Sequence, residues 1–140
     1  MDLDRHAHHF AERFGLLLII LLGEVVISAG NSPVAGEVGV AGVWAALFAA
    51  MVLGAALWWL YFDAAAELNL RVLELSGGSP AIARAIFAGG HMLPAFGLIL
   101  TAAGLGLLLE DHDPPLAAYW LAFGGIGLYL SGARAFLALA

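Results

Sequence analysis

Four long apolar segments, separated by short polar stretches, dominate the pattern of the chain. They cover about residues 14–30, 40–62, 81–109 and 116–139. Each is close to or longer than the roughly 20 residues that cross a bilayer as an α-helix. Turn-forming residues separate the segments at positions 31–33, 76–80 and 113–115. The pattern predicts an all-α fold: a polytopic transmembrane helical bundle with four spanning helices in a single domain.

The composition points to the same environment. Hydrophobic residues make up 63% of the 140 positions and charged residues only 11%, whereas soluble domains carry roughly a quarter charged residues. A soluble chain of this length leaves too much surface in water to hide so many apolar side chains. The predicted partner of the apolar surface is therefore a lipid bilayer, and the predicted location is the plasma membrane, as a multi-pass protein.

Charge and residue types exclude several functions. The net charge is −6 and the chain has no cysteine, so a basic face for nucleic acid, disulfides and cysteine-based metal sites are not expected. No Ser-His-Asp set, glycine-rich phosphate loop or pair of catalytic carboxylates can be assembled from the sequence. We therefore predict no enzyme activity, no cofactor and no nucleic-acid partner.

The arginines predict how the spans are oriented. They are Arg5, Arg13, Arg71, Arg84 and Arg134. With four crossings, all five positions lie on the same side of the membrane, while the other two connections hold Glu37 and the acidic stretch 110–113. Basic residues concentrate on the cytoplasmic side of membrane proteins. Both termini are therefore predicted to be cytoplasmic.

Glu24 interrupts the first apolar run, which reads LLLIILLGEVVISAG from Leu16 to Gly30. It lies about 15–18 Å from the arginine end at 1.5 Å per helical residue. An ionised carboxylate at that depth costs about 2.5–3.5 kcal/mol, so Glu24 is expected to face the bundle or a watery cavity, with Ser28 one turn away as a hydrogen-bond donor. Glu24 is either a proton- or cation-binding carboxylate or a neutral group that joins helices.

His91 is the second polar residue inside a predicted span. Gly89 and Gly90 leave space beside it, and Pro94 is expected to tilt or kink the helix. A neutral imidazole there has two possible roles: it pairs with Glu24 or relays protons, or it is a packed histidine with one hydrogen bond. The first role places Glu24, Ser28 and His91 in one ion, proton or substrate site.

A charged cluster is predicted at the cytoplasmic ends of the helices. Its members are His9, Glu12, Arg13, Asp63, Glu67 and Arg84. Asp63 follows the aromatic stretch that begins at Trp58 and is typical of a membrane interface. Ion pairing is the first interpretation of the cluster and substrate binding the second. The stretch HAHHFAER contains two pairs of possible metal ligands on one helix face each: His8 and Glu12, four residues apart, and His6 and His9, three residues apart. Neither pair has a further ligand, so no metal site is predicted.

The first apolar helix also carries a family resemblance. HFAERFGLLLIILLGEVVISAG, from His9 to Gly30, resembles the signature of the bacterial low temperature requirement protein A family: a His-Phe-x-Glu-Arg-x-Gly-Leu start and Gly-Glu within the helix. The stretches WWLYFD and GHMLPAFGLILTAAG and the last helix with Tyr129 are similar to the family in order and spacing. The resemblance covers essentially the whole chain.

The resemblance implies a longer protein. Family members have an additional N-terminal half, so the chain is similar to the C-terminal half, and its expected partners are that half or a second copy. We expect a membrane protein with a transport or ion-conducting role at Glu24 and His91. The alternative is a non-transporting membrane component that supports assembly or the cold response through helix–helix contacts.

The orientation leads to a labelling prediction. A cysteine introduced at Asp111 should react with a membrane-impermeant maleimide added to intact cells, and one introduced at Ser76 should not, because the arginines place position 76 inside. These 140 residues contain no native cysteine that would react. Labelling at 76 and protection at 111 would reverse the assigned topology.

Overall fold

The computed structural model describes the chain except residues 1, 32, 34–36, 38, 78 and 139–140. It contains four long helices: α1 (Asp2–Gly30), α3 (Val40–Leu75), α4 (Pro80–Leu108) and α5 (Leu116–Ala138). Each holds one stretch long and apolar enough to cross a membrane: Glu12–Gly30, Val40–Asp63, Arg84–Leu108 and Leu116–Arg134. The predicted all-α, four-span membrane fold is confirmed.

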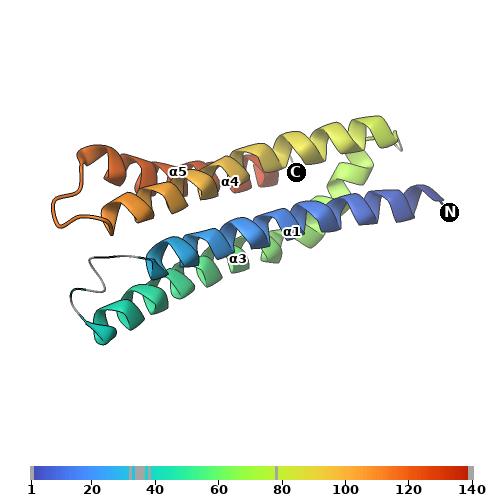
Figure 1. Ribbon diagram of the computed structural model, residues 1–140. Coiled ribbons are helices and arrows are strands. Elements are labelled where there is room, and N and C mark those ends of the chain that lie inside the picture. The colour runs from blue at the N-terminus through green and yellow to red at the C-terminus, as the bar shows by residue number, and fades with distance from the viewer. Residues whose placement is uncertain (1, 32, 34–36, 38, 78, 139–140) are drawn as a thin grey trace.

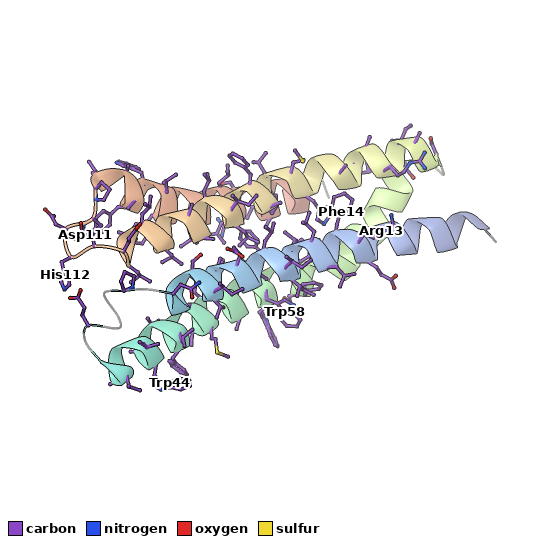
Figure 2. All side chains as sticks on the ribbon, in the orientation of Figure 1. Arg13, Phe14, Trp44, Trp58, Asp111 and His112 are labelled. Carbon is purple, nitrogen blue, oxygen red and sulfur yellow. The ribbon has the colours of Figure 1, made fainter. Side chains whose placement is uncertain are left out.

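Successive helices run in opposite directions along a common axis (Figure 1). The N-terminus and the connection from α3 to α4 lie at one end, and the connections from α1 to α3 and from α4 to α5 lie at the other. Arg13 lies towards the first end and Asp111 and His112 lie at the second (Figure 2). The arrangement separates the arginine-bearing end from the acidic loops, as the sequence predicts.

Two helices continue well past the predicted spans. α1 starts at Asp2, and α3 runs twelve residues beyond Asp63, which adds about 18 Å of helix. The residues after Asp63 are mostly Ala, Leu and Glu, which favour helix, and no glycine or proline interrupts them before Gly77. Gly77 has a positive φ of 55° in the turn that ends the helix. Hydropathy therefore locates the spans but not the ends of the helices.

α4 and α5 approach each other so closely that their backbones touch. A Cβ built on Gly97 would lie 2.6 Å from the Gly125 carbonyl oxygen, and one on Gly104 would lie 2.2 Å from the Ala122 nitrogen. Near the other end of the pair, Gly132 lies against Pro94. α4 remains one helix through Pro94. Small residues allow this approach where lipid supplies no hydrophobic driving force between helices.

Small residues four positions apart lie in a helix contact on α3 but not on α5. Ala50 and Gly54 on α3 are buried, and Gly54 faces α1 near Val26. Gly127 and Ser131 on α5 are exposed, and the Ser131 hydroxyl donates to the Gly127 carbonyl at 2.7 Å. The packing face of α5 is the one that carries Gly125 and Gly132.

The contact between α4 and α5 gives a stability prediction. Gly104→Ala should lower the free energy of unfolding by about 1–3 kcal/mol, because the new methyl group forces two backbones apart. Gly106→Ala is the matched control on the same helix, since no atom lies within 4 Å of its Cβ position, and it should be neutral or slightly stabilising. Thermal unfolding in detergent micelles measures both. Equal stability of the two variants would contradict the close packing.

Candidate functional site

The contacts between α1 and α3 fix the depth of Glu24. Their register is set by three pairs: Gly15–Phe62, Val26–Gly54 and Gly30–Leu47. Glu24 is therefore level with Leu53, about 13 Å along α3 from Trp44 and about 8 Å from Trp58. Both tryptophans are exposed on α3 (Figure 2), and tryptophans concentrate at the two membrane interfaces. Glu24 thus lies in the hydrocarbon region between two aromatic levels.

Glu24 points away from the helices of this chain, and in this respect the sequence prediction is wrong. The buried stripe of α1 consists of Leu18, Leu22, Val25 and Ala29. Glu24 is exposed on another side of α1. The first apolar run carries apolar side chains on both faces, so its pattern does not indicate which face the other helices cover.

The predicted hydrogen bond from Ser28 is not formed either. Ser28 is half-buried on α1. Within the part of the chain that the structure describes, no side chain pairs with the Glu24 carboxylate, and Ser28 and Glu24 are not hydrogen-bonded to each other. Any group that stabilises Glu24 in the membrane therefore comes from outside these described residues.

His91, by contrast, lies inside the bundle. It is only 3% exposed, and its Nε2 is hydrogen-bonded to the hydroxyl of Tyr61 on α3. The ring of Phe14 on α1 lies against the imidazole, with the centroids 4.9 Å apart. His91 thus joins α4 to α3 through a hydrogen bond and to α1 through a ring contact. This is close to the packed histidine of the second interpretation, although Tyr61 was not predicted as the partner.

Glu24 and His91 do not form one site. The contact with Phe14 places His91 level with the first turns of the α1 span, and Glu24 follows ten residues later, which is about 15 Å along the helix. Because Glu24 also faces outwards, the predicted set of Glu24, Ser28 and His91 separates into two places: a polar pair inside the bundle and a carboxylate on its surface.

A second buried hydrogen bond, missed from the sequence, ties α5 to α3. The hydroxyl of Tyr129, which is fully buried, donates to the backbone carbonyl of Leu57 at 2.7 Å. In an α-helix that carbonyl also accepts the N–H four residues later, which belongs to Tyr61. Tyr129 and Tyr61 therefore bring polar atoms to adjacent turns of α3. The sequence does carry a signal for this bond, because Tyr129 lies inside an otherwise apolar span and its hydroxyl needs a hydrogen-bond partner there.

The charged cluster is only partly described. Glu12, Arg13, Asp63 and Arg84 are exposed, while the side chains of His9 and Glu67 lie outside the described part of the structure. Among the described side chains, no ion pair joins Arg13, Asp63 and Arg84. The pairing of Arg13 is therefore not seen there, and the cluster as a whole stays a prediction.

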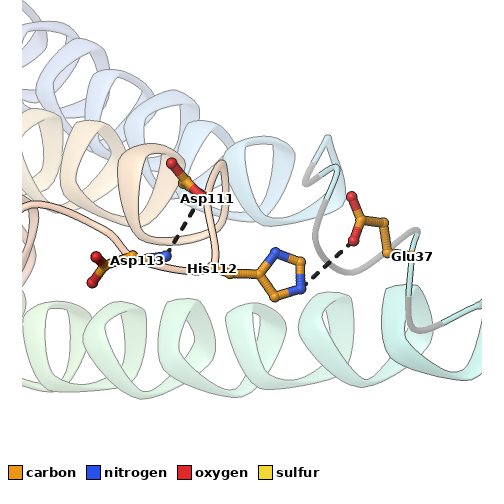
Figure 3. A network of polar contacts seen from close by, with 4 residues as sticks. All are labelled: Glu37, Asp111, His112 and Asp113. Carbon is orange, nitrogen blue, oxygen red and sulfur yellow. Dashed lines mark hydrogen bonds and ion pairs between the residues drawn. The ribbon is translucent and has the colours of Figure 1, made fainter.

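The opposite end of the bundle carries an ion pair between the two connections, the one from α1 to α3 and the one from α4 to α5. His112 Nε2 lies 3.6 Å from the Glu37 carboxylate, and the Asp113 amide donates to the Asp111 side chain at 3.5 Å (Figure 3). Both members of the ion pair are about two-thirds exposed, so the contact contributes little stability. No group of three potential metal ligands occurs among the described residues, and the HAHHFAER histidines lie outside that comparison.

Comparison with known proteins places the chain. A family model described as bacterial low temperature requirement A protein (LtrA) matches residues 2–140. The chain belongs to the LtrA family. An uncharacterized protein of Rhizobium meliloti (strain 1021) is 29% identical to this LtrA-family chain over 133 residues, which are 93% of the chain and 32% of the relative. The chain thus spans about a third of the length of the curated relative that it matches. No solved structure matches it.

The buried pair in this LtrA-family chain gives a second stability prediction. Tyr61→Phe keeps the ring but removes the hydrogen bond to His91, and it should lower stability by about 1 kcal/mol, the scale of hydrogen bonds between membrane helices. Tyr119→Phe is the control, because Tyr119 is exposed and should tolerate the change. Unfolding of both variants in micelles is compared with that of the unaltered chain. An unchanged Tyr61→Phe variant would show that the bond does not stabilise the bundle.

Proposed function

We propose that this LtrA-family chain is part of a membrane protein that moves protons or cations, and that Glu24 is the carboxylate that binds them. The observation that carries the proposal is the position of Glu24: a carboxylate at the depth of the hydrocarbon, with no partner among the described residues. Ionisable residues inside membranes are rare because they are costly, and they commonly mark ion or proton pathways.

The states open to Glu24 fit this role. An ionised carboxylate in hydrocarbon needs a nearby cation or a hydrated path, and a protonated one needs neither. All five arginines of these 140 residues lie near the ends of the spans or outside them, and none of the described arginine side chains pairs with Glu24. Glu24 is thus free to exchange a proton or a small cation, which is the elementary step of a carrier.

The His91–Tyr61 pair supplies a second polar position on the arginine side of Glu24. The two positions are separated by about 15 Å along the axis, so a proton cannot pass directly between them. Water or groups from additional helices would have to bridge the gap. In this proposal the pair lies between Glu24 and the arginine-bearing end, and because His91 is only 3% exposed, its imidazole exchanges a proton with that end only when water reaches it.

A second candidate is a non-transporting membrane component that acts through helix–helix contacts. The face around Glu24 favours it, because Ile20 and Ile27 are exposed apolar side chains and Gly23 has open space beside it. In that role Glu24 would form a hydrogen bond with a neighbouring helix and carry no ion.

Glu24→Gln separates the two candidates. Glutamine keeps the shape and hydrogen bonding of the protonated acid but cannot bind or release a proton. The full-length family protein is purified, reconstituted in vesicles and given a proton, Na⁺ or K⁺ gradient, with an internal pH- or ion-sensitive dye as the readout. Transport predicts that the variant unfolds at nearly the same temperature while its flux falls to that of empty vesicles.

Glu37→Gln is the matched control, since Glu37 is an exposed carboxylate in the connection between α1 and α3, outside the spans, and the flux of this variant should be unchanged. A cold-growth complementation test runs beside the vesicles, in a strain that needs the protein at low temperature. Normal flux and normal growth with Glu24→Gln would end the transport proposal and leave the helix-contact role.

A further inference from the structure

We infer that one face of α1 is an interface for another transmembrane helix, one of different sequence that brings a hydrogen-bond donor to the depth of Glu24. This Glu24 face consists of Leu16, Ile20, Gly23, Glu24 and Ile27. The residues recur every three or four positions and therefore form one stripe along the helix. The inference does not depend on transport, because a carboxylate that only joins helices needs the same partner.

The Glu24 face is open in the chain itself. Leu16, Ile20 and Ile27 are 58%, 68% and 56% exposed, although the stripe of α1 that contains Leu18 and Val25 is fully buried. Gly23 has no atom within 4 Å of its Cβ position. A helix backbone can therefore approach Gly23 closely and reach the carboxylate one residue later.

Glu24 is the residue of the Glu24 face that needs to be covered by protein, because a carboxyl group is costly in contact with lipid. The three apolar side chains are as stable against lipid as against protein. An ionised Glu24 in lipid carries the cost of an uncompensated charge, and a protonated acid in lipid still lacks a hydrogen-bond partner. A donor on a neighbouring helix removes that cost.

A second copy of this chain is the wrong occupant. Copies inserted in the same orientation and paired symmetrically through this face would place Glu24 opposite Glu24 at the same depth. Such a pair needs a shared proton, because two like carboxylates disfavour each other's charged form and offer no cation. An ionised Glu24 calls for a donor or a cation from the facing helix, and charge complementarity therefore favours a helix with a different sequence.

The source of that helix is indicated by the length of the relative. This chain covers 32% of the R. meliloti protein, and the remaining two thirds is long enough for several further spans of roughly 20 residues. We assign the occupant of the Glu24 face to that remaining part of LtrA-family proteins, in the same polypeptide or as a separate one.

Photo-crosslinking in native membranes tests the assignment. The photoreactive residue p-benzoylphenylalanine replaces Ile20 in one variant and Ile27 in another, and Val52 in the control. Val52 is exposed on α3 and is level with the Glu24 region by the register of the two helices. After irradiation, mass spectrometry identifies the crosslinked peptide.

The expected result is a crosslink from positions 20 and 27 to an apolar segment from the part of the family protein outside residues 1–140. That segment carries a basic, amide, hydroxyl or indole side chain within about one helical turn of the crosslinked position. The control at position 52 should capture lipid only. Crosslinks between identical copies, capture of lipid alone at positions 20 and 27, or a partner segment without a donor would each overturn the inference. Because the readout is a crosslink and not ion flux, the experiment tests the interface independently of the transport proposal.

Discussion

The hydrocarbon core of a bilayer offers no hydrogen bonds, and this constraint explains where the polar groups of the chain lie. The helices satisfy their own backbones, and the hydroxyl of Thr101 turns back onto the Gly97 carbonyl at 2.8 Å. Tyr129 finds a carbonyl on α3, and Tyr61 finds the imidazole of His91. Glu24 departs from this rule within the described chain, and for that reason it carries the functional argument.

The number and position of the spans followed from the sequence because a bilayer selects for length and apolarity alone. The helix ends were less predictable, since α3 continues past Asp63 on helix-forming residues that hydropathy does not register. The glycines that join α4 and α5 were also not identified beforehand. With 18 glycines in the chain, small residues recur at helical spacing along several stripes. Gly127 belongs to one such stripe and is nevertheless exposed, so spacing alone does not identify the packing face.

The candidate site was predictable in its residue types but not in its geometry. Glu24 and His91 stood out because each is a polar residue in an apolar run. Which way they face was hidden, because a membrane helix is apolar towards lipid as well as towards its neighbours. The partner of His91 was hidden for a related reason: Tyr61 lies thirty residues away on another helix, and it was read as one member of an aromatic interface.

The hydrogen bond from Tyr129 joins a side chain to a main chain, and this gives its two ends different freedom to change during evolution. The acceptor is the carbonyl of position 57, so any residue that fills the buried space of Leu57 preserves the bond. The donor is a phenol whose length and angle no aliphatic residue reproduces. Sequence drift can therefore alter α3 without separating it from α5, whereas a single change in the last helix is enough to break that connection.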